Sequence, residues 1–291
     1  MNNIGAMPPE QPLALLLRDT ERQLAEAGVD NPLLDSKILV SHALGLDRVD
    51  LLMQAERLLS ADETIRVQAL ITRRCRREPV ARILGEREFW GLPFGLNEAT
   101  LEPRPDSETL IDKALPELHG RSGLSLLDLG TGTGCLLLAL LHELPGAVGI
   151  GIDAAPRAIE QALANARRLH LDDRAIFRVG NWLDNVDGLF DLIISNPPYI
   201  PRQDMVTLMP EVREHDPALA LDGGEDGLQV YREIIPRLPK FLKPNGFVVF
   251  EVGQGQAADV ARLFQQSGFY GVRIHEDFGG VERCIRASLA A

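Results

Sequence analysis

The residues of this chain best suited to chemistry are Asn196-Pro197-Pro198-Tyr199, which follow the apolar run Leu192-Ile193-Ile194-Ser195 without an intervening turn. The residue before a proline favours extended backbone, and proline has no N–H to donate, so this strand end is stiff and rich in hydrogen-bond acceptors. Acceptors beside an aromatic ring suit a planar NH2 group, such as a carboxamide or the exocyclic amine of a nucleobase. The motif predicts a site for an NH2 group and leaves open which one is bound.

A second candidate site is the glycine-rich segment Asp128-Leu129-Gly130-Thr131-Gly132-Thr133-Gly134, which joins a predicted strand to a leucine-rich helix. Its glycines let the backbone approach a ligand without side-chain obstruction, although tight packing of the strand on the helix would also explain them. The next predicted strand ends in Asp153, where a carboxylate binds ribose hydroxyls in wound sheets. Together these features predict an adenosine cofactor.

The neighbours of the glycine-rich segment favour S-adenosylmethionine over a dinucleotide. Cys135 stands where the dinucleotide fingerprint has Gly or Ala, and Asp128 is an unfavourable neighbour for a pyrophosphate. Asn181-Trp182 follows the third predicted strand, where the adenine ring would lie. Trp182 is either an apolar wall for that ring or a core residue.

An α/β framework positions these motifs. From Leu124 onward, apolar strand candidates alternate with amphipathic helices, which predicts a wound, mainly parallel sheet with an antiparallel pair at its edge. The three motif-bearing loops then share the carboxyl edge of the sheet, where such sheets bind ligands. The predicted strands are Ser125–Leu129, Val148–Asp153, Ala175–Val179, Leu192–Ser195, Gly246–Val252, Val272–His275 and Cys284–Ala287.

The N-terminal part has a different pattern. From Pro12 to about Arg77 apolar residues recur at helical spacing, and Asn31-Pro32 and the capping-box sequence Ser60-Ala61-Asp62-Glu63 mark helix starts. The glycines, prolines and aromatic residues that follow, including Phe89-Trp90, predict a hairpin. We therefore expect a bundle of three or four helices over 1–78, a hairpin linker over 79–105 and a catalytic domain over 106–291.

Composition narrows the class of protein. With 291 residues, 45% hydrophobic and 25% charged, the chain fits a globular protein, and it shows neither a membrane-length apolar run nor a signal-peptide pattern, so we expect a cytoplasmic protein. Three scattered cysteines suggest neither a disulfide framework nor a metal site. A net charge of −12 disfavours a nucleic-acid substrate. The cluster Arg73, Arg74, Arg76 and Arg77 predicts either a solvated helix end or a docking surface.

Residues Asp128 to Gly134, Asp153 and Asn196 to Tyr199 resemble those of class I S-adenosylmethionine-dependent methyltransferases acting on NH2 groups. The flanking sequence is similar to the PrmC/HemK family of protein-(glutamine-N5) methyltransferases over most of the chain from about Glu78 to Arg286. The further matching stretches are Glu78–Ala81, Glu88–Phe94, Pro103–Glu108, Asp216–Leu221, Gly223–Leu228 and Glu251–Gly253.

This resemblance implies a Rossmann-like methyltransferase fold with a seven-stranded, mainly parallel sheet and a small N-terminal helical domain joined by a β-hairpin. It implies that the substrate is the glutamine of the Gly-Gly-Gln motif in class-1 peptide chain release factors. One departure is Asn181, where relatives commonly carry an acidic residue. The implied cofactor contacts are Gly130, Thr131, Gly132, Thr133, Gly134, Asp153, Trp182 and Asn196, and the implied substrate contacts are Asn196, Pro197, Pro198 and Tyr199.

A mechanism follows as a hypothesis. The nitrogen of a carboxamide is a poor nucleophile because its lone pair is delocalised into the carbonyl, so positioning must supply much of the catalysis. We expect the Asn196 side-chain oxygen and the Pro197 carbonyl to accept the two N–H bonds, with Tyr199 packed on the amide plane. The helical domain and the Phe89-Trp90 hairpin would hold the release factor beside the site.

Other functions remain open at this point. The nearest alternative is a glutamine methyltransferase of a large-subunit ribosomal protein, which shares the chemistry. An adenine-N6 nucleic-acid methyltransferase fits the same NH2 site, although the acidic charge weighs against it. A nicotinamide-dependent oxidoreductase and a non-catalytic adenosine-binding protein are more distant alternatives, which Cys135 and the intact Asn196 and Tyr199 disfavour.

Overall fold

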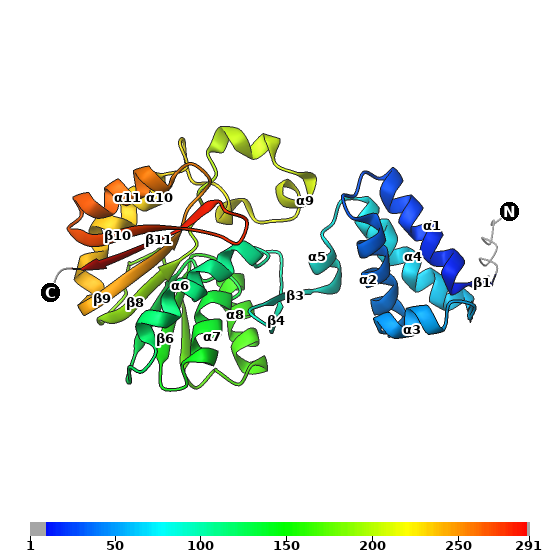
Figure 1. Ribbon diagram of the computed structural model, residues 1–291, viewed down its shortest axis with the longest axis horizontal. Coiled ribbons are helices and arrows are strands. Elements are labelled where there is room, and N and C mark those ends of the chain that lie inside the picture. Colours follow the sequence, from blue (N-terminus) through cyan, green and yellow to red (C-terminus); the bar gives the residue numbers. More distant parts are fainter. Residues whose placement is uncertain (1–9, 290–291) are drawn as a thin grey trace. The chain divides into compact units, whose positions relative to one another are not determined.

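The computed structural model describes residues 10–289, and it divides the chain into two compact units, residues 1–85 and 86–291 (Figure 1). The division falls inside the segment 79–105 that the sequence predicts to be a linker. The reason is that a short helix, α5 (Val80–Leu84), packs its Ile83 into the core of the first unit, whereas the hairpin after it belongs to the second unit.

The first unit is the predicted helical bundle. Its longer helices are α1 (Leu13–Glu26), α2 (Pro32–Leu44) and α4 (Ala61–Cys75), with the short α3 (Arg48–Met53) and a two-residue pairing of β1 (Gln11–Pro12) with β2 (Leu58–Leu59). The capping box that opens α4 is confirmed, because Ser60 and Glu63 bond reciprocally to each other's backbone N–H. Pro32 occupies the first turn of α2 as expected, but the Asn31 side chain makes no cap hydrogen bond.

The arginine cluster is largely built into the first unit. Arg74, almost fully buried, places Nε 2.8 Å from Asp35 Oδ2 and so joins α4 to α2. Arg73 pairs with Glu78, and Arg77 donates to the carbonyl of Gly28 at 2.6 Å. These contacts tie the three side chains to the bundle. Arg74 is buried and not solvated, whereas Arg73 lies partly exposed in the last turn of α4, as expected for a helix end. A docking surface at this cluster stays a prediction.

The second unit begins with a hairpin of β3 (Glu86–Phe89) and β4 (Leu92–Gly95). Phe89 and Phe94 are buried in the core of this unit with their rings edge to face, 6.2 Å between centroids. The Asn165 amide bonds both backbone groups of Gly95, and its Nδ2 also donates to the carbonyl of Thr133 at 2.9 Å. The hairpin is thus fastened to the glycine-rich segment.

The predicted seven-stranded sheet is confirmed, with the order β10-β11-β9-β8-β5-β6-β7. Strands β9, β8, β5, β6 and β7 run parallel, and β11 and β10 are antiparallel to their neighbours. The strands are β5 (Ser125–Leu129), β6 (Val148–Asp153), β7 (Ala175–Val179), β8 (Phe190–Ser195), β9 (Leu242–Glu251), β10 (Phe269–Glu276) and β11 (Glu282–Leu289).

Four of these strands extend beyond their predicted bounds. For example, β9 begins at Leu242 although it contains the turn-like sequence Pro244-Asn245-Gly246, because Leu242 pairs with Phe190 across an irregularity in the register. The sequence therefore did not predict this part of β9, because its turn-like residues gave no sign of the pairing with β8.

Helices cover both faces of the sheet (Figure 1). Along β5, Leu126 packs with one core cluster and Leu127 with the other, because successive side chains of a strand point to opposite faces. The first cluster includes α6 (Glu108–Leu118), α7 (Cys135–Glu143) and α8 (Pro156–Arg168), and the second includes α10 (Gln229–Ile234) and α11 (Ala257–Gln266). A long excursion between β8 and α10 carries only the four-residue α9 (Pro210–Arg213) and 3-10 turns at Arg202–Thr207 and Ala218–Ala220.

Candidate active site

The strand register brings the predicted motifs to one edge of the sheet. Leu129 at the end of β5 pairs with Ile152 of β6 and with Ser195 of β8, and Ser195 pairs with Phe250 of β9. The residues that follow these pairs, Gly130, Asp153, Asn196 and Glu251, therefore stand at neighbouring positions along the carboxyl edge. The Ser195 hydroxyl donates to the Leu129 carbonyl at 2.7 Å and fastens two of these strand ends together.

The glycine-rich segment is held by hydrogen bonds to the next strand. The N–H groups of Gly130 and Thr131 both donate to the carbonyl of Ile152 at 2.9 Å. The Gly132 N–H donates to Asp153 Oδ2 at 2.8 Å, and the Ala155 N–H donates to Oδ1 of the same carboxylate at 2.9 Å. Asp153 therefore shapes the loop as well as facing the cavity beside it.

The three glycines serve different purposes. All have positive φ, at 71°, 54° and 80° for Gly130, Gly132 and Gly134, which other residues rarely adopt. A Cβ on Gly134 would lie 3.2 Å from Leu138 and Phe177, and one on Gly130 would lie 3.3 Å from the Trp182 ring, whereas one on Gly132 would meet nothing within 4 Å. Packing thus explains Gly134, and the open space at Gly132 suits approach by a ligand.

A cavity of about 280 Å³ lies over the carboxyl edge of the sheet. Its wall combines the glycine-rich segment with apolar and polar side chains from the segment 99–107 and from the excursion after β8. Of the predicted site residues, Gly130, Thr131, Gly132, Thr133, Asp153, Trp182, Asn196 and Pro198 line it. Trp182 lines the cavity and also packs against the core, so the core role is confirmed, and its contact with an adenine ring stays a prediction.

Two carboxylates beside the glycine-rich segment differ in exposure. Asp128 is fully buried, and burial raises its pKa to about 7, although the Thr131 hydroxyl donates to its Oδ2 at 2.6 Å and opposes the shift. Burial also raises the pKa of Asp153, and the N–H groups of Ala155 and Gly132 oppose it. Asp153 lines the cavity, so it is the carboxylate that can meet ligand hydroxyls.

A smaller cavity of about 200 Å³ adjoins the first and shares Leu101, Arg104, Asn196 and Ala220 with it. Tyr199 lines this second space together with apolar residues of the excursion. Arg104 forms an ion pair with Asp216, whose side chain is almost fully buried, which ties the segment 99–107 to the excursion. Asn196 therefore stands where a large and a small cavity meet.

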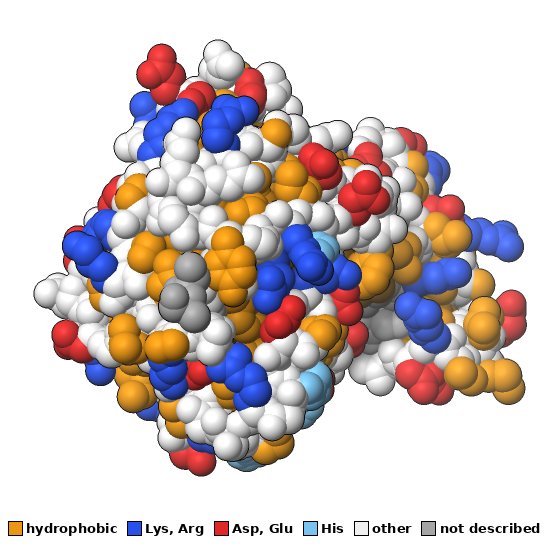
Figure 2. Space-filling view, turned by 60° about the vertical axis from the view of Figure 1, so that its left-hand side comes forward, with side chains coloured by type: hydrophobic (Ala, Val, Ile, Leu, Met, Phe, Trp, Pro, Cys, Tyr) orange, Lys and Arg blue, Asp and Glu red, His pale blue; other side chains and the backbone are white. Residues whose placement is uncertain are grey.

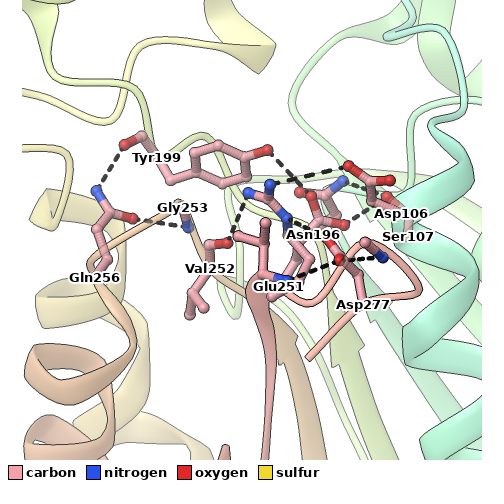
Figure 3. Close-up of polar contacts among 12 residues, drawn as sticks. Asp106, Ser107, Asn196, Tyr199, Glu251, Val252, Gly253, Gln256 and Asp277 are labelled. Atoms are coloured by element: carbon pink, nitrogen blue, oxygen red, sulfur yellow. Dashed lines mark hydrogen bonds and ion pairs between the residues drawn. The ribbon is translucent and has the colours of Figure 1, made fainter. Parts of the chain in front are cut away.

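Behind Asn196, four polar side chains form a connected hydrogen-bond network (Figure 3). Asn196 Nδ2 donates to Ser107 Oγ at 3.1 Å, and Ser107 Oγ donates to Glu251 Oε2 at 2.5 Å. The Tyr199 hydroxyl donates to Glu251 Oε1 at 3.1 Å. Burial raises the pKa of Glu251 to about 7, against the opposing effect of the Ser107 hydrogen bond and of Arg283.

The backbone of Tyr199 is also fixed. Gln256 at the start of α11 donates from Nε2 to the Tyr199 carbonyl at 2.9 Å, and its Oε1 accepts from the Gly253 N–H (Figure 3). A Cβ on Gly223 would lie 2.7 Å from Tyr199 Cα, and one on Gly227 would lie 2.3 Å from its carbonyl oxygen. These glycines of the excursion are therefore explained by close approach to the Asn-Pro-Pro-Tyr segment.

Two predicted site residues, Gly134 and Pro197, line neither of the two cavities. Conversely, Ser107 and Glu251 lie in stretches matched by resemblance, but the sequence assigned them no role. A signal existed for Glu251, because a carboxylate directly follows the apolar run Phe247-Val248-Val249-Phe250, where a buried charge needs partners. For Ser107 the sequence offers no comparable signal.

Two further features concern the described part of the chain as a whole. None of its helices is both long enough and apolar enough to cross a membrane. Among residues 10–289, no group of three or more His, Cys, Asp or Glu side chains has an arrangement that could hold a metal ion.

Comparison with protein families gives two matches. Residues 16–85 match the family model described as the PrmC N-terminal domain, and residues 121–276 match one described as a methyltransferase domain. The first match lies in the helical unit, and the second covers the sheet apart from β11.

Curated relatives match nearly the whole chain. A release factor glutamine methyltransferase of Rhodospirillum rubrum is 49% identical over 265 residues, which cover 91% of this chain and 81% of the relative. One of Bradyrhizobium diazoefficiens is 46% identical, covering 93% of this chain and 92% of the relative. Among solved structures, a methyltransferase from Pyrococcus furiosus has a TM-score of 0.50 at 17% identity, covering 77% of this chain and 98% of that chain, a likeness of fold alone.

Proposed function

The chain belongs to the family of release factor glutamine methyltransferases, and from this premise we propose that it methylates a glutamine of class-1 peptide chain release factors. The methylated atom is the side-chain amide nitrogen of the glutamine in their Gly-Gly-Gln motif, and S-adenosylmethionine is the methyl donor. The observation that carries the proposal is the position of Asn196 at the junction of two cavities, one of which has the glycine-rich wall of a nucleotide site. A cytoplasmic location, as the sequence predicts, accords with such a substrate.

The residues of the larger cavity fit the proposed cofactor. Gly132 leaves open space beside the backbone, the Asp153 carboxylate would bind ribose hydroxyls, and the Trp182 ring would offer an apolar surface to adenine. Thr131, Thr133 and the backbone of Gly130 complete the wall. When bound, the sulfonium of the cofactor supplies an activated methyl group.

The acceptor side supplies orientation. The Asn196 side-chain oxygen accepts one N–H of the substrate carboxamide, and the smaller cavity beside Tyr199 takes the glutamine side chain. Correct orientation of two reacting groups is worth roughly 7–11 kcal/mol in favourable cases. Acceptors aimed at the amide nitrogen also favour the positive charge that develops on it during transfer.

The structure modifies two parts of the expected mechanism. The Tyr199 hydroxyl donates to Glu251, so the ring is held at one end, and Tyr199 lines the smaller cavity. Pro197 is buried and lines neither cavity, so a role for its carbonyl rests on the family resemblance.

Docking of the release factor by residues 1–78 and by the hairpin remains a proposal. Phe89 is only 1% exposed, so its side chain serves the core of the second unit. Trp90 is half-buried, and its indole N–H donates to Glu143 at 2.9 Å, so part of this ring stays available to a partner. Loss of release-factor affinity on removal of residues 1–78 would support the docking role, and unchanged affinity would contradict it.

The decisive experiment incubates the protein with S-adenosylmethionine labelled in its methyl group and, separately, with a release factor, a large-subunit ribosomal protein and DNA. We expect label on the release factor alone, and none on a release-factor variant whose Gly-Gly-Gln glutamine is replaced by alanine. Label on the ribosomal protein or on adenine would establish one of the alternatives and refute the proposal.

The surface accords with a protein substrate. On the face shown in Figure 2, Lys and Arg side chains are interspersed with Asp, Glu and apolar side chains. Binding to a phosphate backbone is dominated by clustered positive charge, and the whole chain carries a net charge of −12.

A further inference from the structure

The hydrogen-bond network behind Asn196 has a defined direction. Glu251 and Ser107 are 1% and 3% exposed, so water does not compete for their hydrogen bonds. An ionised carboxylate can only accept, and Glu251 therefore takes the hydroxyl hydrogen of Ser107. Since that hydrogen is committed, the Ser107 oxygen can only accept from Asn196, which requires Nδ2 and not Oδ1 at this position.

This direction matters because a carboxamide has two orientations of nearly equal shape. The nitrogen and oxygen of the Asn196 side chain differ little in size, so packing alone selects weakly between the two orientations of the amide. The hydrogen-bond partners therefore determine which orientation is adopted. With Nδ2 at Ser107, Oδ1 occupies the other end of the amide. In the opposite orientation Asn196 would present an NH2 group to the substrate NH2 group, donor against donor.

We propose that Ser107 and Glu251 are positioning residues for methyl transfer, which act together through Asn196 by keeping its amide oxygen turned toward the substrate carboxamide. The proposal rests on the proposed function and adds to it the reason why a buried carboxylate stands at the end of β9. Tyr199 strengthens the arrangement, because its hydroxyl hydrogen bond to Oε1 leaves Oε2 to Ser107.

Protonation of Glu251 would release this control. A protonated carboxyl can donate to Ser107, which is then able to donate to Asn196. The direction of the hydrogen bonds is then no longer fixed, and the Asn196 amide can adopt either orientation. The titratable groups around Glu251 come from several elements. They are Tyr199 from the excursion, Arg283 and Cys284 from β11, Cys135 from α7 and Asp106 beside Ser107, while the Tyr231 hydroxyl from α10 donates to the Glu251 backbone carbonyl. Burial is the main cause that raises the pKa of Glu251 to about 7, and Arg283 opposes it.

The test uses the full chain, a release factor and saturating S-adenosylmethionine, with kcat measured across neutral pH. Glu251→Gln has nearly the shape of the protonated carboxyl, so we expect kcat to fall roughly 10- to 100-fold at alkaline pH, the cost of one misdirected hydrogen bond to a charged or reacting group. In wild type kcat should fall as pH falls through about 7, and in Glu251→Gln this dependence on the Glu251 pKa should disappear.

Ser107→Ala and Ser107→Thr form the matched pair. Ser107→Ala removes the link to Glu251, and we expect a loss of kcat similar to that of Glu251→Gln, whereas Ser107→Thr retains the hydroxyl and should recover most of the rate. For every variant, the Kd of S-adenosylmethionine by titration calorimetry should stay within about twofold of wild type. Ser107 lines the same cavity, but the proposed cofactor contacts at Gly132, Asp153 and Trp182 are unchanged. Thermal unfolding identifies a variant that does not fold, and the kcat values of the remaining variants then test the positioning role.

Three outcomes would overturn the inference. They are wild-type kcat in both Ser107→Ala and Glu251→Gln, a wild-type pH profile in Glu251→Gln, or losses that appear in cofactor affinity and thermal stability with kcat unchanged. Failure of the wild-type protein to methylate any release factor would instead refute the proposed function, so the two results are distinguishable.

Discussion

The proposed active site has two halves, a cofactor side and an acceptor side, and they are built by different means. On the cofactor side, backbone N–H groups and glycines shape the cavity, and Asp153 is bound by the N–H groups of Gly132 and Ala155, both close in the chain or on the adjoining loop. On the acceptor side, Asn196 depends on Ser107, 89 residues away, and Ser107 on Glu251, 144 residues away. One half is therefore set by local backbone geometry, and the other by side chains that only the folded sheet brings together.

This contrast predicts that substitutions in the two halves affect different quantities. Changes on the acceptor side should mainly lower the rate of methyl transfer and affect cofactor binding less. Changes on the cofactor side should weaken cofactor binding and spare the rate at saturation.

The largest effect is expected at Asn196. Asn196→Ala removes the acceptor for the substrate N–H, and kcat should fall by about 10²- to 10³-fold, the range found for loss of one preorganised hydrogen bond in a transition state. Cofactor affinity should persist in part, as measured by calorimetry. Asn196→Asp keeps an acceptor oxygen and serves as the control that should retain more activity. Undiminished methyl transfer by Asn196→Ala would eliminate the proposed role.

A smaller effect is expected for Asp153→Ala. Loss of the carboxylate removes a partner for ribose hydroxyls and frees the N–H groups of Gly132 and Ala155, so the Kd of S-adenosylmethionine should rise by about 10- to 100-fold. Asp153→Asn preserves one acceptor and should lie between this variant and wild type. If titration gave an unchanged Kd for Asp153→Ala, the ribose assignment would be wrong.

Gly132→Ala tests the open space beside the cofactor. The substitution places a methyl group at φ 54°, where strain costs about 1–2 kcal/mol, and extends it toward the ligand. We expect the Kd of S-adenosylmethionine to rise by about tenfold with kcat at saturation nearly unchanged. Gly120→Ala is the matched control, since Gly120 also has positive φ, at 78°, and open space around it, but lines neither cavity. An equal Kd change in the control would contradict a local role for Gly132.

The last effect concerns stability. Asp128 and Glu251, one in each half, are buried carboxyls whose pKa values are raised to about 7. A carboxyl with a raised folded-state pKa binds more protons folded than unfolded, so stability should decline by about 1 kcal/mol per pH unit for each group as pH rises from about 4 to about 7. Asp128→Asn should remove part of this slope in urea unfolding at several pH values. A slope equal to that of wild type would contradict the raised pKa.

The contrast between the halves also explains what the sequence could predict. The wound sheet, its antiparallel edge and the glycine-rich loop follow from strand periodicity and from residues adjacent in the chain, and the structure confirms the sheet. Ser107 and Glu251 could not be joined from sequence, because the hydrogen bond between them exists only once β9 lies beside β8 and the turn before α6 closes over their ends.

The same reasoning applies to the arginine cluster and to the hairpin. The sequence of a run of arginines does not show whether their side chains are solvated or form ion pairs. Arg74 pairs with Asp35 only because α2 packs beside α4 in the folded bundle. The sequence predicts a docking role for Phe89, because an aromatic residue in a glycine-rich segment can belong either to an interaction site or to a hydrophobic core. In the structure, Phe89 packs in the hydrophobic core of the second unit.

Asn165 has a consequence for the response of the protein to ligand. Its amide bonds Gly95 of the hairpin and the Thr133 carbonyl of the glycine-rich segment, so the two segments share one set of hydrogen bonds. A ligand that binds only the folded site suppresses the local opening of whatever is coupled to it. Amide hydrogen exchange at Gly95 should therefore slow when S-adenosylmethionine is added, which makes a residue outside the cavity wall a reporter of its occupancy.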